Sequence, residues 1–267
     1  MHLDYTSISD DEIEQIEKAT QRVVTQALQE YSREAKEIFD NTYAPRENEV
    51  IVLAEDLTQY ALEVAECYPI NKRYAGFIDY KRVRWLAMPF GLIPQAFLVD
   101  AKASTENNRD TLQQSQLPMD ADFESNGNSF HMKAGVVPHL EIPSFDGSQI
   151  RAIATSIFVH FYYAKIANDK PPYRDLRSIF ALSIPHARLK SRYNPNSTST
   201  FFGQGKHSPA RSEDPRIRVY FTKLRQMMPW RLQELKYLTS KYTEPVWRDV
   251  DPSMRGETNS AFQFIGR

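Results

Sequence analysis

Two acidic residues and one lysine between positions 79 and 102 have the types and spacing that phosphodiester hydrolysis requires. Asp100 and Lys102 stand two residues apart in LVDAKAS, and Asp79 precedes them in GFIDYKRV. Carboxylates hold a divalent metal against a phosphate, while an ammonium group orients the attacking water and stabilises developing negative charge. Mg²⁺ prefers oxygen ligands and keeps several waters, so two or three carboxylates suffice. We therefore expect Mg²⁺ as the cofactor, Asp79 and Asp100 as its ligands and all three residues as the catalytic group.

A β-hairpin is the element expected to position these side chains. Residues 74–87 and 92–103 are rich in β-branched and aromatic residues, and a turn containing proline and glycine joins them. Since residues two apart share one face of a strand, Asp100 and Lys102 point the same way. Pairing across the hairpin can bring Asp79 alongside. Two acids on adjacent apolar strands cost desolvation and repulsion, which a bound cation relieves.

The triplet of an acid, any residue and lysine is a weak pattern by itself. About one or two are expected by chance in a chain of average composition and this length. Others occur here, among them those at 34–36 and 234–236, which both fall in predicted amphipathic helices. Only the triplet at 100–102 ends an apolar strand with a second acid before it. A structural ion pair between strand residues is the alternative interpretation.

Two helices are predicted ahead of the hairpin, at 10–41 and 51–67, from apolar residues at helical spacing. A third acidic metal ligand is expected from the second helix. Glu55 and Glu63 are the candidates, and they lie about two turns apart, so they can share a face. The helical segment 1–45 is a candidate oligomer interface.

The rest of the chain mixes strand and helix signals. Apolar runs at 156–165 and 176–185 suit central strands. The fold class expected is α/β, with residues 1–267 as one domain built on a central mixed β-sheet flanked by helices. The remaining predictions, in chain order, are a helix at 105–117, loops over 119–148, a long polar loop at 193–215, a strand at 216–221 and a helix at 229–238.

Charge is unevenly distributed along a chain whose net charge is only −1. Residues 1–66 carry sixteen acidic and five basic side chains, whereas residues 188–231 carry ten basic and two acidic ones. An acidic face and a basic face predict a polyanion site on the second. The alternative is a solvated surface whose charges happen to cluster. We therefore assign 188–231 as the expected DNA-recognition region.

The hairpin resembles the PD-(D/E)xK nuclease superfamily. Asp79 matches the first acid of that pattern, Asp100 and Lys102 match the second acid and the lysine, and Ile78 stands where the pattern has proline. Longer segments resemble the SfiI family of type II restriction endonucleases nearly end to end, and the likeness is weakest at 121–152 and after 238. They include VIVLAEDLTQYALEVAECYPINKRYAGFIDYKRVRWL, LVDAKASTENNRDTLQQSQLPMDA, TSIFVHFYY, SIPHARLKSRYNP, FFGQGKHSPAR, RIRVYF and PWRLQEL.

This resemblance implies a specific activity on double-stranded DNA. It implies a homotetramer of two back-to-back dimers that binds two DNA sites at once. It also implies the target GGCC–five unspecified pairs–GGCC, cut inside the spacer to leave 3′ overhangs. Two other functions remain open: a structure-selective repair nuclease on the same core, and a non-enzymatic DNA-binding protein with a vestigial site.

Several residues are expected to contact DNA. Arg216 and Arg218 lie two apart in a short strand, so both project from one face and can read neighbouring guanines. The alternative for this pair is salt bridging to acids. His186 either approaches DNA or packs within its loop. Four further candidates come from a helix start and a glycine-containing loop: Arg109, Lys206, His207 and Arg211.

Other classes of protein are disfavoured by composition. The single cysteine excludes an intramolecular disulfide framework and a multi-cysteine zinc site. The N-terminus is acidic and polar, unlike a signal peptide, and no apolar run approaches the ~20 residues of a membrane helix. We expect a cytoplasmic protein.

Overall fold

The computed structural model describes residues 7–70, 80–88, 91–105, 111–143, 146–205, 216–237 and 246–248, with the backbone alone at 80–88, 91–92, 111 and 246–248. Within these ranges, helices that combine the length and the apolar character of a membrane span are absent.

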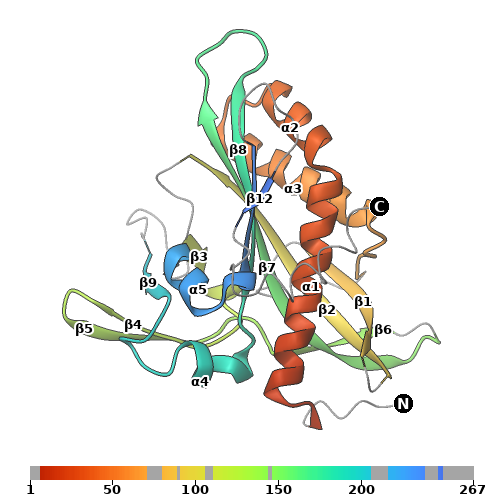
Figure 1. Cartoon of the computed structure of the whole chain (residues 1–267), viewed down its shortest axis with the longest axis vertical. Helices are drawn as coiled ribbons and strands as arrows, with labels where there is room; N and C mark the ends of the chain where they lie inside the picture. The colour runs from red at the N-terminus through yellow and green to blue at the C-terminus, as the bar shows by residue number, and fades with distance from the viewer. Residues whose placement is uncertain are drawn as a thin grey trace.

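Three helices form the N-terminal part: α1 (Asp10–Glu30), α2 (Ser32–Asn41) and α3 (Glu47–Val64) (Figure 1). The predicted helix 10–41 is thus interrupted at Tyr31, which ends α1. Helix α1 begins after a capping box, in which the Ser9 hydroxyl accepts from the Glu12 amide at 3.2 Å and the Glu12 carboxylate accepts from the Ser9 amide at 2.7 Å. Such a box satisfies backbone donors that the first turn leaves unpaired.

A seven-stranded mixed sheet forms the centre of the molecule, with the order β1-β2-β7-β8-β11-β12 and β6 paired to β7. The predicted catalytic hairpin is β1 and β2, and the predicted central strands are β7 and β8. The β2–β7 pair is parallel, and the other described pairs in this sheet are antiparallel. The strands are β1 (Tyr80–Met88), β2 (Gly91–Ser104), β6 (His139–Pro143), β7 (Gln149–Lys165), β8 (Arg174–Ile184), β11 (Leu232–Lys236) and β12 (Val246–Arg248).

The two faces of this sheet are packed differently. On β2, Phe97 and Val99 belong to the apolar cluster that includes buried residues of α1, α2 and α3. Ala96 and Leu98 belong to the cluster on the other face. Because side chains alternate along a strand, Asp100, Lys102 and Ser104 lie on the face opposite α3.

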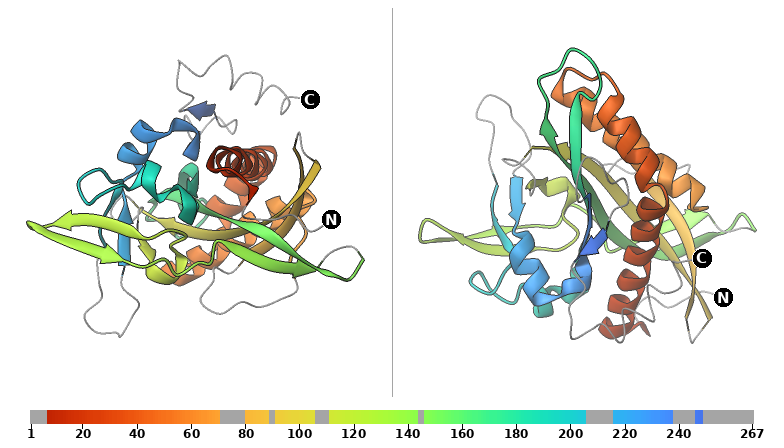
Figure 2. Two further views of the ribbon diagram at one scale, coloured as in Figure 1. Left: turned by 90° about the horizontal axis from the view of Figure 1, so that it is seen from below. Right: turned by 45° about the horizontal axis from the view of Figure 1, so that its top comes forward.

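Smaller elements surround the β7–β8 side of the sheet. The β4–β5 hairpin projects on the side away from β1 in all views (Figure 2). Its turn is Asn126-Gly127, whose φ angles of 50° and 76° suit these two residue types. The elements are β3 (Thr111–Gln113), β4 (Ala121–Ser125), β5 (Asn128–Met132), α4 (Lys190–Tyr193), β9 (Phe202–Gln204), β10 (Arg216–Val219), α5 (Phe221–Met227) and the 3-10 turns at 114–116, 187–189 and 229–231.

Four secondary-structure predictions are wrong, and one of them is the loop at 193–215, which contains strand β9. The segment 105–117 contains strand β3 and a 3-10 turn in its described part, and 119–148 contains β4, β5 and β6. The segment 229–238 forms a 3-10 turn and strand β11. Its Leu, Glu and Lys residues favour a helix locally, but pairing with β8 from Leu232–Leu182 to Lys236–Ser178 overrides that preference. The predicted strand 216–221 is shorter, since α5 begins at Phe221.

Candidate active site and DNA-binding residues

Asp100 and Lys102 lie side by side near the carboxyl end of β2. Lys102 Nζ is 2.8 Å from Asp100 Oδ2. The side chain of Asp100 is 7% exposed, whereas that of Lys102 is 32% exposed. The carboxylate is thus held within the protein, and the ammonium group reaches solvent. A carboxylate in such a place needs a cation beside it, and oxygen ligands of this kind fit Mg²⁺.

The neighbouring strand fixes the end of β2 on this face. In the parallel register, Asp100 is opposite Phe158 and Lys102 is opposite His160. The His160 side chain is buried, and its Nε2 lies 2.9 Å from Ser104 Oγ. This hydrogen bond joins β7, at the residue opposite Lys102, to β2 two residues beyond Lys102. The backbone that carries Asp100 and Lys102 is therefore supported by side-chain contacts as well as by the strand ladder.

The other predicted metal ligands are less closely defined. Asp79 lies outside the described residues. Glu55 is half-buried on α3, and Glu63 is exposed there and accepts a hydrogen bond from Gln59 Nε2 at 2.9 Å. In the part of the chain that the structure describes, groups of three or more His, Cys, Asp or Glu side chains able to hold a metal are absent. Neither glutamate is thereby brought into a three-ligand cluster with Asp100.

Much of the predicted basic region is paired with the acidic N-terminal helix. Arg188 lies 2.8 Å from Asp10, and Arg192 lies 2.7 Å from Asp11. Arg192 also contacts a further acid of α1 at 3.0 Å. The acidic and basic runs of the sequence therefore face each other across α1 and α4. These two arginines are engaged by acids of the same subunit, which corrects the expectation that the two charge types form separate faces.

The innermost of these pairs joins Glu17 to Arg231 at 2.7 Å, and both side chains are 0% exposed. The guanidinium also lies 4.3 Å from the ring centres of Trp230 and Tyr193. Burial raises the pKa of the Glu17 carboxyl, while Arg231 and the His186 amide, which donates to Glu17 at 2.7 Å, oppose that rise. We take the pair as ionised, because an arginine stays protonated in proteins.

His186 packs within its loop, which was one of the two roles considered for it, the other being an approach to DNA. It is 1% exposed, its Nε2 lies 2.8 Å from the Pro138 carbonyl, and its Nδ1 accepts from the Arg188 amide at 3.2 Å. Burial lowers its pKa to about 4. A buried neutral imidazole cannot approach DNA in this conformation.

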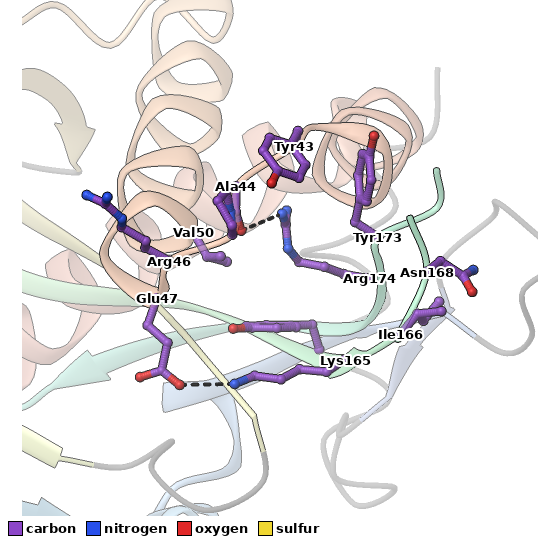
Figure 3. A pocket seen from close by; sticks show the side chains of 12 residues that line it. Tyr43, Ala44, Arg46, Glu47, Val50, Lys165, Ile166, Asn168, Tyr173 and Arg174 are labelled. Carbon is purple, nitrogen blue, oxygen red and sulfur yellow. Dashed lines mark hydrogen bonds and ion pairs between the residues drawn. The ribbon is translucent and has the colours of Figure 1, made fainter. Parts of the chain in front are cut away.

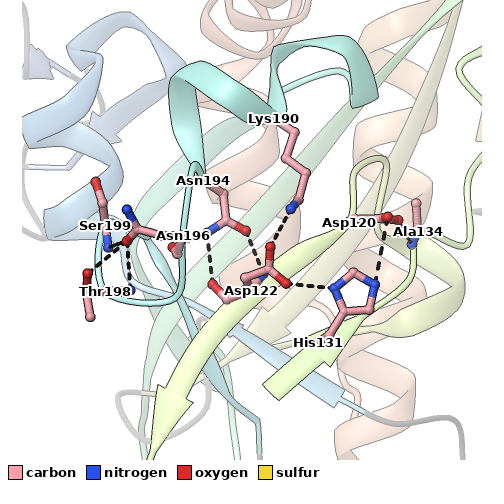
Figure 4. Close-up of polar contacts among 9 residues, drawn as sticks. All are labelled: Asp120, Asp122, His131, Ala134, Lys190, Asn194, Asn196, Thr198 and Ser199. Atoms are coloured by element: carbon pink, nitrogen blue, oxygen red, sulfur yellow. Dashed lines mark hydrogen bonds and ion pairs between the residues drawn. The ribbon is translucent and has the colours of Figure 1, made fainter. Parts of the chain in front are cut away.

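Lys190 belongs to a polar cluster that ties α4 to the β4–β5 hairpin (Figure 4). It donates to the Asp122 carboxylate, whose other oxygen lies 2.6 Å from His131 Nδ1. The Asn194 side chain accepts a hydrogen bond from the Asp122 amide at 2.6 Å and donates one to the Asp122 carbonyl at 2.8 Å. These contacts lower the pKa of Asp122, the Lys190 hydrogen bond most and the His131 one next. Lys190 is therefore also a structural cation.

Arg216 and Arg218 remain on a different element, strand β10, between β3 and β9. Both are half-buried, whereas Ile217 and Val219 are buried, so the two arginines project from the same face as predicted. Beside them, Gly203 approaches Tyr220 so closely that an added Cβ would lie 2.5 Å from its ring. The other predicted DNA contacts lie outside the described residues: Arg109, Lys206, His207 and Arg211.

A separate hollow lies on the helix-covered side, where α2 joins α3 (Figure 3). Its buried Arg174 donates to three backbone carbonyls, those of Phe39 at 2.9 Å, Thr42 at 2.8 Å and Ala44 at 3.1 Å. Lys165 at its rim pairs with Glu47 at 3.1 Å. Arg174 thereby fixes the corner between the helices to β8, which is a structural role.

Known proteins match this chain over most of its length. The sequence profile of the family described as "Type II restriction enzyme SfiI" matches residues 34–235. The chain belongs to this SfiI family. The type II restriction enzyme SfiI of Streptomyces fimbriatus is 60% identical over 270 residues, which cover 100% of both chains. A crystal structure of tetrameric SfiI bound to cognate DNA is 59% identical and superposes with a TM-score of 0.84 over 95% of each chain.

A more distant structure shares the fold. The restriction endonuclease BglI, crystallised with its DNA recognition sequence, has 15% identity and a TM-score of 0.65, over 84% of this chain and 90% of its own. The expected fold class, a restriction-endonuclease-like core with a mixed sheet flanked by helices, is confirmed. The resemblance to the SfiI family is confirmed too, and the chain is a type II restriction endonuclease.

Sequence reasoning missed the structural use of the basic residues. Nothing in the local sequence connects Glu17 with Arg231, which are far apart in the chain and meet only when α1 crosses the sheet. The signal available for the β4–β5 hairpin was Asn126-Gly127 between residues of alternating character, a strong hairpin turn. That hairpin carries the partner of Lys190.

Proposed function

We propose that this SfiI-family chain is a Mg²⁺-dependent endonuclease that uses Asp79, Asp100 and Lys102 to cut double-stranded DNA. The observation that carries the proposal is the Asp100–Lys102 pair, with its packed carboxylate and its solvent-reaching ammonium group. Asp79 directly precedes Tyr80, and Tyr80 pairs with Val99, which directly precedes Asp100. This adjacency supports Asp79 and Asp100 as two ligands of one metal.

Each residue has a separate task in hydrolysis. A bound Mg²⁺ supplies Lewis acidity at the phosphate and lowers the pKa of a bound water. Asp100, and Asp79 with it, binds the cation through carboxylate oxygens. Lys102 Nζ, held 2.8 Å from Asp100, orients the attacking water and stabilises the charge that develops at phosphorus. In-line attack breaks the P–O3′ bond, so the products carry 5′-phosphate and 3′-hydroxyl ends.

We propose Glu55 and Glu63 of α3 as the candidates for a third acidic ligand, although β2 turns Asp100 to the sheet face opposite α3. Glu55 is half-buried and Glu63 is exposed. A metal ligand must lie beside the carboxylate of Asp100. Alanine at the true ligand should therefore raise the Mg²⁺ concentration that cleavage requires. Alanine at the other glutamate should leave it unchanged.

The proposed target is GGCC–five unspecified pairs–GGCC, cut in the spacer to leave 3′ overhangs. Guanine presents O6 and N7 acceptors in the major groove, which suit bidentate arginine. Arg216 and Arg218 on one face of β10 meet that requirement. Arg109, Lys206, His207 and Arg211 are proposed as further contacts to bases or phosphates. The 60% identity to SfiI across both whole chains supports this target.

The proposed assembly is a homotetramer of two dimers that bridges two DNA sites, with residues 1–267 forming one nuclease domain in each subunit. The crystal structure of tetrameric SfiI bound to cognate DNA covers 95% of this chain at 59% identity, which supports that assembly. A palindromic target also matches two-fold protein symmetry. We propose that the enzyme acts in the cytoplasm.

The test is digestion of DNA carrying one or two copies of the proposed target, with Mg²⁺ or EDTA. Wild type should give discrete fragments only with Mg²⁺ and should cut the two-site DNA faster, and Asp100→Ala should give none. Specific binding without cleavage by wild type would contradict the enzymatic proposal. Discrete cleavage at another sequence would retain the chemistry and overturn the target.

A further inference from the structure

A polar pair lies beside Lys102 on the face of the sheet that carries Asp100. His160 is opposite Lys102 in the parallel β2–β7 register, and it is only 4% exposed. Its Nε2 lies 2.9 Å from the hydroxyl of Ser104, the next residue of β2 on that face. We name His160 and Ser104 the β2–β7 polar pair. The proposed mechanism gives neither residue a task.

The β2–β7 polar pair borders the Lys102 side chain on two sides. His160 stands about 5 Å away on the neighbouring strand, and Ser104 follows about 7 Å along β2. The hydrogen bond between them ties these two neighbours to each other. Asp100 lies on the remaining side along β2, and the Lys102 ammonium group is 2.8 Å from its Oδ2. The lysine therefore faces the carboxylate, as the proposed chemistry requires.

The imidazole of His160 is itself held by the next strand. Phe180 of β8 is opposite His160 in the β7–β8 register, and the two ring centres lie 6.4 Å apart. The ring of Phe180 is in turn 5.5 Å from that of Phe221 at the start of α5. His160 is thus fixed between β2 and β8. A side chain locked in this way can fix the geometry of a reactive group next to it.

We propose that His160 is a positioning residue for Lys102 and acts through its hydrogen bond with Ser104. The inference rests on the proposed function, in which Lys102 orients the attacking water. Without the imidazole, the Ser104 hydroxyl is free to turn toward the lysine and to draw the ammonium group away from Asp100. Small displacements of a reactive group, or loss of a supporting partner, slow catalysis about 10- to 100-fold.

The test compares His160→Phe with His160→Gln, using single-turnover cleavage in Mg²⁺ and DNA affinity in Ca²⁺. Phenylalanine fills the site with a ring but offers no nitrogen, so the cleavage rate should fall about 10- to 100-fold. DNA affinity should not change, because the buried imidazole cannot contact DNA in this conformation. The glutamine amide can still donate to the Ser104 hydroxyl, so His160→Gln should cut at a rate close to wild type.

Two further comparisons show whether the hydrogen bond is the cause. Ser104→Ala removes the same bond, so the double variant H160F/S104A should be no slower than the slower single variant. Ser178→Ala is the matched control, because Ser178 shares a cross-strand row with Ser104 and donates to Glu234 at 2.8 Å. It loses a hydrogen bond on the same face, away from Lys102, and should cut like wild type.

A Lys102→Ala background separates this inference from the proposed function. In that background His160→Phe should slow cleavage no further, because it acts through the lysine. Normal cleavage by His160→Phe, with slow cleavage by Lys102→Ala, would overturn the inference alone. Normal cleavage by Lys102→Ala would overturn the task of the lysine and the inference with it.

Other results would assign the β2–β7 polar pair to folding alone. These are a His160→Gln variant as slow as His160→Phe, a Ser178→Ala variant as slow as Ser104→Ala, and multiplied effects in H160F/S104A. A loss of DNA affinity equal to the loss of rate would do the same. So would a rate loss that follows loss of folded protein in circular dichroism melting.

Discussion

Two ion pairs in this molecule have nearly equal distances and different surroundings. Glu17 and Arg231 lie 2.7 Å apart with both side chains fully buried, and Arg231 stacks between aromatic rings. Asp100 and Lys102 lie 2.8 Å apart, with the carboxylate packed and the ammonium group one-third exposed. Distance alone does not distinguish a structural pair from a reactive one.

Access to solvent is what separates the two pairs. A nucleophilic water and a phosphate must reach a hydrolytic site, and only the Asp100–Lys102 pair offers a charged group at the surface. The Glu17–Arg231 pair has its hydrogen-bond partners inside the protein, because Glu17 also accepts a hydrogen bond from the His186 amide. Its charges are committed to joining α1 to the end of the sheet. Variants of Arg231, Lys102, Arg218 and Lys190 test this contrast.

Arg231→Ala should destabilise the fold most. Glu17 would remain as a buried charge without its partner, and breaking such a pair costs about 3–5 kcal/mol. Urea unfolding followed by circular dichroism measures the loss. The double variant Glu17→Leu with Arg231→Met should recover most of it, since apolar replacement of both partners removes the desolvation cost. A fully stable Arg231→Ala protein would contradict the structural role.

Lys102→Ala should lower the rate of DNA cleavage by about 10²–10³-fold, the usual cost of losing one group that stabilises developing charge. With Mg²⁺ present to neutralise the packed Asp100 carboxylate, the free energy of unfolding should change by less than about 1 kcal/mol, because the lysine is partly exposed. Single-turnover cleavage with Mg²⁺ gives the rate. Lys165→Ala is the matched control, since Lys165 forms a surface pair with Glu47 at 3.1 Å. Equal rates for the two variants would remove Lys102 from the mechanism.

Arg218→Ala should weaken specific DNA binding by about 1–3 kcal/mol, which is roughly 10- to 150-fold, if Arg218 reads a guanine. Arg192→Ala should leave affinity nearly unchanged, because Arg192 is engaged by two acids of α1. Fluorescence anisotropy at fixed salt, in Ca²⁺ to prevent cleavage, compares them. A larger loss for Arg192 would show that the α1 pairs open on binding DNA.

Lys190→Ala should cost about 1 kcal/mol of stability or less at neutral pH, as expected for a partly exposed pair. Contacts with Lys190 and His131 lower the pKa of Asp122 in the folded chain. Its stabilising effect is therefore complete above the ordinary aspartate pKa of about 3.9 and is lost as pH falls through the lower folded-state pKa. Urea unfolding at pH 7 and at about pH 3 should show the difference between wild type and variant shrinking in acid. A constant difference would contradict the ion pair.

The sequence predicted the hairpin and the central strands well because their signals are local. A nearly continuous apolar run up to Asp100 defines β2, and the run at 156–165 is too apolar to be anything but buried. Residues two apart on β2 had to share a face, so the Asp100–Lys102 contact followed from strand geometry. Asp79 and four of the predicted DNA contacts lie outside the described residues, and their roles stay predictions.

What could not be predicted depends on contacts between distant segments. The segment LQELK has helix-forming residues, yet β8 supplies backbone partners that make it strand β11. The excess of basic residues at 188–231 suggested one DNA-binding surface, but α1 pairs with the first part and β10 carries Arg216 and Arg218 elsewhere. Net charge along a sequence does not show which charges meet in space.

The most direct test compares two near-isosteric changes, Asp100→Asn and Glu17→Gln, for both cleavage and unfolding. We expect Asp100→Asn to reduce the Mg²⁺-dependent cleavage rate by about 10³-fold with little change in stability. We expect Glu17→Gln to lower the free energy of unfolding by several kcal/mol while folded protein cuts at the normal rate. Normal cleavage by Asp100→Asn, or a stable Glu17→Gln protein that cannot cut, would contradict the distinction between the two pairs.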